Sequence, residues 1–98
     1  MISADFKDKG ILVTGAVSGI GLATARLFAE NGAKVAVNHL PDDASAKGVL
    51  EGLLVEGLDV VAAPGDVSVA GEAETMVNAA VSALGRLDVL INNAGTSN

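Results

Sequence analysis

Hydrophobic and polar positions follow two alternating patterns along this chain. Short apolar runs at about residues 10–14, 34–38, 59–63 and 88–91 are bounded by glycine, proline or charged residues, as is typical of buried strands. The longer segments between them carry apolar residues three and four positions apart, which predicts helices. The sequence therefore predicts four strands alternating with three helices.

Each predicted helix has a start signal, an end signal or both. The first helix ends at Asn31-Gly32 and carries an apolar stripe of Ile20, Ala23, Thr24, Leu27 and Phe28. The second begins at Pro41-Asp42-Asp43, with Asp42 or Asp43 as the cap, contains Gly48 and Gly52, and ends at Gly57. Ser68 caps the third helix and Gly85 closes it, and its stripe is Ala73, Met76, Val77, Ala80, Val81 and Leu84.

Alternation of strands with helices of this length predicts βαβ units and a parallel sheet in an α/β fold. Right-handed crossovers then give the strand order 3-2-1-4, which is half of a Rossmann-type doubly wound sheet. In such sheets ligands bind beyond the carboxyl ends of the strands, where the order reverses. The turns after Val13 and after Ile91 are both expected at that point.

Composition limits the class of protein. The 98 residues form at most one domain, and its core must be Val, Leu, Ile and Ala because Phe6 and Phe28 are the only aromatic residues. A net charge of −6 disfavours nucleic acid and anionic membranes as partners. There is no cysteine, and His39 is the single histidine, so no metal site is expected. The chain has no apolar run long enough for a membrane span and no signal-peptide pattern at its start, so we expect a cytoplasmic protein.

A glycine-rich turn joins the first strand to the first helix. Three glycines stand at Gly15, Gly19 and Gly21, where the free N–H groups of a helix start favour an anion. Gly15 is suited to the tight turn, Gly19 to close approach of a pyrophosphate, and Gly21 to close helix packing. The spacing G-x-x-x-G-x-G differs from both G-x-G-x-x-G and the P-loop. The turn therefore predicts a phosphate site without deciding the ligand.

Three motifs in order resemble those of the short-chain dehydrogenases/reductases, over essentially all 98 residues. They are the T-G-x-x-x-G-x-G element at Thr14–Gly21, the acidic-apolar pair Asp66-Val67, and the N-N-A-G element at Asn92–Gly95. The resemblance implies that residues 1–98 form part of an NAD(P)-binding domain. It also implies that the intact protein is a homo-oligomeric oxidoreductase.

The resemblance implies which residues contact the dinucleotide. Asp66 would accept from the adenine amino group, the Val67 N–H would face the adenine ring, and Thr14 and Asn92 would tie the first and fourth strands together. The glycine turn would line the pyrophosphate and ribose, through Gly15, Ala16, Val17, Ser18, Gly19, Ile20 and Gly21. Asn93, Ala94 and Gly95 would border the riboses.

Structural alternatives stay open for each motif. Glycine-rich turns occur in α/β domains that bind nothing, and Asp66 could simply favour the start of the following helix. Asn92 and Asn93 could be turn residues chosen for their tolerance of left-handed geometry.

The cofactor, NAD or NADP, depends on the residue about twenty positions past the glycines, which is His39. Neither the carboxylate that favours NAD nor the arginine that favours NADP stands there. Ser18 occupies the place where NADP-preferring relatives often carry a basic residue, and Asp42 and Asp43 add negative charge nearby. These residues favour NAD, although Asn38 and His39 could also donate to a 2′-phosphate.

The family's reaction is hydride transfer between a nicotinamide and a small carbonyl or alcohol, as in oxoacyl reductases or sugar dehydrogenases. It needs a Y-x-x-x-K pair and a serine, which by resemblance would lie beyond Asn98, and the chain contains no tyrosine. No catalytic residue is therefore expected here, and these 98 residues alone are predicted to be inactive. The sequence does not identify the substrate.

Three interpretations remain. The chain is the dinucleotide-binding part of an oxidoreductase, a nucleotide-binding module without turnover, or an interaction fragment that pairs through its open sheet edge. An encoding reading frame that continues through Y-x-x-x-K would favour the first.

Overall fold

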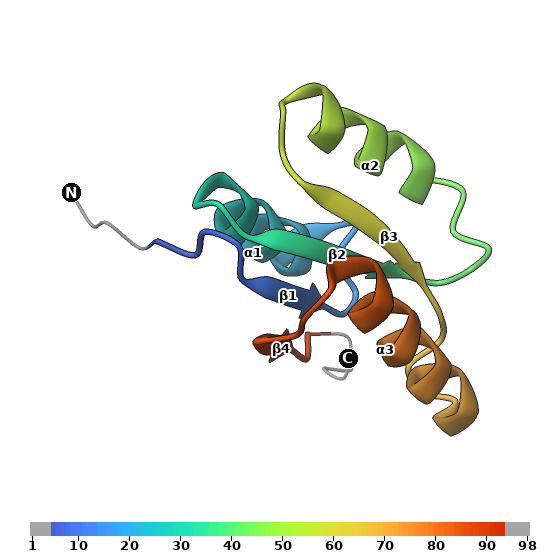
Figure 1. Ribbon diagram of the computed structural model, residues 1–98. Coiled ribbons are helices and arrows are strands. Elements are labelled where there is room, and N and C mark those ends of the chain that lie inside the picture. Colours follow the sequence, from blue (N-terminus) through green and yellow to red (C-terminus); the bar gives the residue numbers. More distant parts are fainter. Residues whose placement is uncertain (1–4, 94–98) are drawn as a thin grey trace.

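Strands and helices alternate in the computed structural model, which describes residues 5–93 (Figure 1). The strands are β1 (Gly10–Val13), β2 (Lys34–His39), β3 (Val60–Pro64) and β4 (Val89–Ile91), and the helices are α1 (Gly19–Glu30), α2 (Ala46–Val55) and α3 (Ala70–Leu84). All strand pairs are parallel, and the sheet order is β3-β2-β1-β4. The predicted α/β fold and the order 3-2-1-4 are confirmed.

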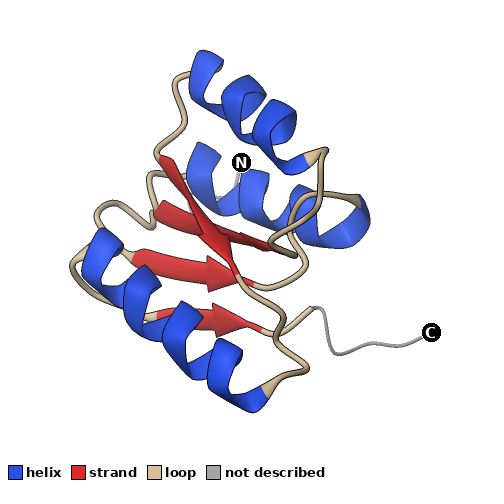
Figure 2. Cartoon of the chain, turned by 90° about the vertical axis from the view of Figure 1, so that its right-hand side faces the viewer, coloured by secondary structure: helices blue, strands red, loops and turns tan. Residues whose placement is uncertain are grey.

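Helices cover both faces of the sheet: α1 and α2 lie on one face and α3 on the other (Figure 2). Because successive side chains of a strand point to opposite faces, β1 contributes to both layers. The first layer packs Ile11, Val13, Val35 and Val37 against Ala25, Ala29 and Leu53. The second packs Leu12, Ala36 and Ala63 against Met76, Ala80 and Leu84. The core is aliphatic, as predicted.

Helix α1 buries a different face from the predicted one. Its buried residues are Gly21, Ala25 and Ala29, at a spacing of four, whereas Ile20 is 79% exposed and Leu27 is 60% exposed. Small side chains let the helix lie close to the sheet. Ala23 is exposed as well, so the predicted stripe was wrong at Ile20, Ala23 and Leu27.

The starts of α2 and α3 also differ from prediction. Helix α2 begins at Ala46 rather than at residues 41–43, and Ser68 lies two residues before α3 and does not cap it. In each case an aspartate closes a turn ahead of the helix: Asp43 accepts from Ser45, and Asp66 accepts from Ser68. These local hydrogen bonds hold the chain in a turn and so delay the helix start. The closure of α3 by Gly85, whose φ is +83°, is confirmed.

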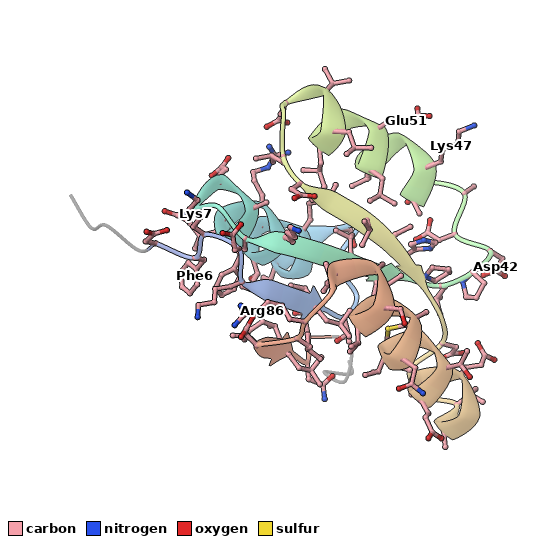
Figure 3. All side chains as sticks on the ribbon, in the orientation of Figure 1. Phe6, Lys7, Asp42, Lys47, Glu51 and Arg86 are labelled. Carbon is pink, nitrogen blue, oxygen red and sulfur yellow. The ribbon has the colours of Figure 1, made fainter. Side chains whose placement is uncertain are left out.

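The Asp88 carboxylate, which also forms an ion pair with Arg86, joins the amino ends of β1 and β4 away from the predicted site. The Asp88 carboxylate accepts from the Arg86 guanidinium at 2.8 Å and from the Gly10 N–H at 2.9 Å. Hydrogen bonds from Arg86 and then from Gly10 lower the pKa of Asp88 to about 2. Arg86 is exposed at this end of the sheet (Figure 3). Lys47 and Glu51 lie far from it, on the outer side of α2. Ionised Asp88 therefore stabilises this end of the fold.

Candidate cofactor-binding site

The turn between β1 and α1 brings its first and last glycines into contact. Gly15 adopts a φ of +58°, as a tight left-handed turn requires. A Cβ on Gly21 would lie 2.1 Å from the carbonyl oxygen of Gly15 and 2.7 Å from Nδ2 of Asn93. The absence of a side chain at Gly21 therefore lets the start of α1 lie against the turn. The close contact is with the turn itself, rather than with the sheet as the sequence suggested.

Gly19, at the start of α1, faces open space. Its φ is +55°, and no atom lies within 4 Å of the place that a Cβ would occupy. The first backbone N–H groups of α1 have no partner within the helix. An anion could therefore approach the amino terminus of α1 here, as the sequence predicts.

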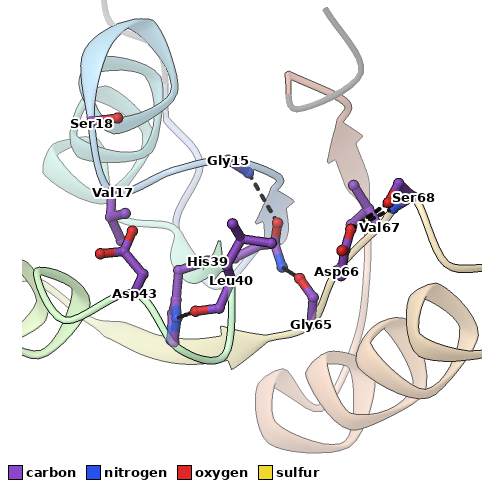
Figure 4. A pocket seen from close by; sticks show the side chains of 11 residues that line it. Gly15, Val17, Ser18, His39, Leu40, Asp43, Gly65, Asp66, Val67 and Ser68 are labelled. Carbon is purple, nitrogen blue, oxygen red and sulfur yellow. Dashed lines mark hydrogen bonds between the residues drawn. The ribbon is translucent and has the colours of Figure 1, made fainter. Parts of the chain in front are cut away.

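A cavity of about 300 Å³ opens beside this turn, beyond the carboxyl ends of β1, β2 and β3 (Figure 4). Six of the predicted contact residues line it: Gly15, Val17, Ser18, His39, Asp66 and Val67. The other lining residues are Asn38, which the sequence suggested only as an alternative phosphate donor, and Leu40, Asp43, Gly65 and Ser68, which were not predicted as contacts. The structure thus brings the glycine turn, the end of β2 and the loop after β3 together around one space.

Asp66 lies at one side of the cavity with its carboxylate held in place (Figure 4). Its Oδ1 accepts from the Ser68 hydroxyl at 2.6 Å and from the Ser68 N–H at 3.0 Å, and these hydrogen bonds lower the pKa of Asp66. The Asp66 N–H donates to Glu72 Oε1 at 3.1 Å. Asp66 is therefore ionised at neutral pH, and a carboxylate in this form can accept a hydrogen bond from an amino group.

Asp43 supplies a second carboxylate on the opposite side of the cavity, beside His39 (Figure 4). The Ser45 hydroxyl and N–H donate to its Oδ1 at 2.6 and 2.9 Å and lower its pKa. The His39 Nδ1 lies 2.7 Å from the carbonyl oxygen of Leu40. Asp43 therefore gives this side of the cavity a negative charge at neutral pH.

Asn38 is not available to donate to a phosphate. It is 2% exposed, and its Nδ2 donates to the carbonyl oxygens of Ala63 at 2.8 Å and Gly65 at 3.1 Å. Its Oδ1 accepts from the Gly15 N–H at 3.0 Å. The suggestion that Asn38 could bind a 2′-phosphate was therefore wrong. The signal in the sequence was a polar residue at the end of a strand buried on both faces, where it must find partners.

Thr14 and the loop after β4 hold β1 and β4 together. The Thr14 N–H donates to the Ile91 carbonyl at 3.0 Å, and the Thr14 hydroxyl lies 3.3 Å from Asn92 Oδ1. The Asn93 N–H donates to the Thr14 hydroxyl at 2.9 Å, and its Nδ2 donates to the Gly15 carbonyl at 3.1 Å. The tie expected from Thr14 and Asn92 is confirmed, and Asn93 extends it to the glycine turn.

The remaining predicted contacts lie elsewhere. Ala16 is fully buried in the core, and Ile20 projects from the outer surface of α1. Ala94 and Gly95 lie outside the described residues.

The part of the chain that the structure describes contains neither a metal-binding cluster nor a membrane-spanning helix. Among residues 5–93, no group of three or more His, Asp or Glu side chains is placed to hold a metal ion. Over the same range, no helix has the length and apolar character to cross a membrane.

A parallel sheet in the order 3-2-1-4, with a glycine turn at a helix start and a cavity beyond its strands, is the arrangement of half of a Rossmann-type α/β domain. The family model described as short chain dehydrogenase matches residues 9–98, and this chain belongs to that family.

Individual relatives show how much of the family's length is present. The chain is 44% identical over 87 residues to the 3-oxoacyl-[acyl-carrier-protein] reductase FabG of Staphylococcus aureus, covering 89% of this chain and 35% of that protein. It is 42% identical over 91 residues to the L-rhamnose 1-dehydrogenase (NAD(P)(+)) of Azotobacter vinelandii, covering 90% and 36%. A solved short chain dehydrogenase from Mycobacterium avium superposes with a TM-score of 0.87 at 33% identity, covering 97% and 37%. The chain thus spans about a third of the length of these relatives.

Proposed function

We propose that this chain is the dinucleotide-binding part of an NAD(P)-dependent oxidoreductase that acts on a small carbonyl or alcohol. The single observation that carries the proposal is the juxtaposition of an open helix amino terminus at Gly19 with a cavity that holds an ionised Asp66. When bound, the nicotinamide cofactor supplies hydride-transfer chemistry. Relatives named as an oxoacyl reductase and a rhamnose dehydrogenase support the substrate class only broadly.

The residues present fit such a cofactor. A side chain at Gly19 would fill the space through which a pyrophosphate would reach the α1 amino terminus. Asp66 would accept from the adenine amino group, and the Val67 N–H would face the ring. Gly15, Val17 and Ser18 of the glycine turn, together with Asn93, would border the phosphates and riboses. We also propose that the whole enzyme is cytoplasmic and homo-oligomeric, which the family resemblance supports.

The proposal favours NAD over NADP. Asp43 lines the cavity as a carboxylate and would repel a 2′-phosphate, whereas Ser18 and His39 offer no permanent positive charge. The amide of Asn38, which was the other candidate donor, is fully occupied by backbone carbonyls. The charge around the cavity therefore supports an unphosphorylated adenosine ribose.

Calorimetry of the chain with ADP-ribose and NADH tests the phosphate role of Gly19. We expect Gly19→Val to abolish measurable binding, because the branched side chain would occupy the place of the pyrophosphate. Valine is also strained at a φ of +55°, so a matched control is needed. Gly85→Val carries the same change at a φ of +83°, also with nothing within 4 Å, at the far end of α3. The Gly85 variant should bind normally. Equal affinity in wild type and Gly19→Val would refute the phosphate site.

A further inference from the structure

Asn38, in β2, connects two loops of the cavity through one buried side chain. Its Oδ1 holds the N–H of Gly15 in the glycine turn, and its Nδ2 holds the carbonyl oxygens of Ala63 and Gly65 at the end of β3. In Figure 4 the dashed lines that reach Gly15 and Gly65 are two of these bonds. Asp66 follows Gly65 directly, so the side chain spans from the proposed phosphate turn to the proposed adenine loop.

The surroundings of Asn38 require an amide. One end of the side chain faces a donor, and the other faces two acceptors. A carboxylate could still accept from Gly15, but it would face two carbonyl oxygens without a proton to share. An apolar residue would leave the Gly15 N–H and both carbonyls without this partner in a buried position.

Two backbone hydrogen bonds also hold these loops, but each of them holds a single loop. The Gly65 N–H donates to the His39 carbonyl at 2.9 Å, and the Ala16 N–H donates to the Asn38 carbonyl at 2.8 Å. Each of these joins β2 to one loop. Among the described residues around this cavity, the Asn38 side chain is the group that bonds to both loops at once.

We infer that Asn38 is a positioning residue for the dinucleotide, because it fixes the placement of the Asp66 loop relative to the glycine turn. This inference rests on the proposed function. Its consequence is that selectivity for adenine depends on Asn38, although the Asn38 side chain is buried beneath the cavity and has no hydrogen-bonding group left for the ligand.

The test compares the affinity of the chain for ADP-ribose with that for inosine diphosphate ribose, in which a carbonyl replaces the adenine amino group. The ratio of the two affinities is the readout, because partial unfolding lowers both affinities by the same factor. In Asn38→Asp we expect affinity for ADP-ribose to fall roughly tenfold, the scale set by losing one or two hydrogen bonds. The adenine preference should fall at least about threefold, since the Asp66 loop is released while the bond to Gly15 is kept.

Asn78→Asp is the matched control, since it makes the same chemical change at an exposed position of α3 and should retain both affinities. If Asn38→Asp melts below the assay temperature, the ratio is measured on Asn38→Ser, whose hydroxyl can serve only one of the two carbonyls. A wild-type chain that binds neither ligand, or shows no adenine preference, would refute the proposed site. A wild-type preference that survives in the folded Asn38 variants would refute the positioning role alone.

Discussion

Replacing Gly21 by alanine should separate the packing role of this glycine from its helix propensity. The added Cβ would lie 2.1 Å from the Gly15 carbonyl oxygen, well inside the 3.0 Å below which such contacts are essentially never found. The start of α1 would therefore have to move away by about 0.9 Å, and the turn or Asn93 would have to move with it. Gly48→Ala is the matched control. Gly48 is also the third residue of its helix, and no atom lies within 4 Å of its Cβ position.

The two expected contributions to the free energy of unfolding have opposite signs. Alanine gains about 1 kcal/mol over glycine inside a helix, and this gain is common to both variants. Overpacking of the kind met at Gly21 costs about 1–3 kcal/mol. Gly48→Ala should therefore be stabilised by about 1 kcal/mol, whereas the Gly21 variant should be less stable than Gly48→Ala by about 1–3 kcal/mol. For a chain of this size, this difference corresponds to a gap in Tm of at least about 4 °C.

Thermal and urea unfolding, followed by circular dichroism, measure these differences, and calorimetry with ADP-ribose measures binding. We expect the Gly21 variant to bind roughly tenfold more weakly or worse, because the α1 amino terminus is displaced from the glycine turn. Gly48→Ala should bind like wild type. If Gly21→Ala were as stable as Gly48→Ala and bound ADP-ribose normally, the argument for close packing of α1 on the turn would be wrong.

Four further outcomes follow from the charges, the open sheet edge and the absence of tyrosine. Asp88 has a pKa of about 2 in the fold against 3.8 ordinarily, so its contribution to stability is present above about pH 4 and is lost as the pH falls toward 2. Asp88→Asn should therefore flatten the dependence of the urea unfolding midpoint on pH in this range. His39→Asp should raise the preference for NADH over NADPH in calorimetry, and an unchanged preference would mean that another residue is the selector. Sedimentation velocity should show that the chain self-associates, because β4 pairs only with β1 among the described residues and Leu90 is 51% exposed. Leu90→Lys should reduce the self-association. A wild-type monomer that melts sharply would contradict this prediction. The 98 residues should also show no dehydrogenase turnover, which a spectrophotometric NADH assay would check.

The strands and their order were predictable because their signals are local or topological. Buried runs such as Ile11-Leu12-Val13 identify central strands, and right-handed crossovers leave few ways to arrange them. The convergence of the glycine turn with the loop after β4 followed from this order alone. The hydrogen bonds of Thr14 then confirmed it at atomic distances.

The hydrophobicity of the residues in α1 did not predict which face of the helix is buried. The prediction took Ile20 and Leu27 from the helical spacing of apolar residues, but the residues that α1 buries are Gly21 against the glycine turn, and Ala25 and Ala29 in the core. A helix can approach a sheet closely only where the residues at the contact are small, and a hydrophobic pattern does not show which positions those are. Gly21 was expected to allow close packing, but its close contact is with Gly15 and Asn93 and not with the sheet.

Asn38 shows why the site was predicted less completely than the fold. The sequence places it at the end of β2 beside His39, and an amide there is chemically able to donate to a phosphate. Its partners, however, are 23 residues earlier at Gly15 and 25 and 27 residues later at Ala63 and Gly65. The distances from Asn38 to these partners depend on how the glycine turn and the end of β3 meet at β2, and no local pattern encodes that. What the sequence does encode is a constraint: β2 is buried on both faces, so a polar side chain within it must be satisfied by backbone groups. Applied at the outset, that constraint would have removed Asn38 from the candidate ligand contacts and pointed to the ends of the neighbouring strands as its partners.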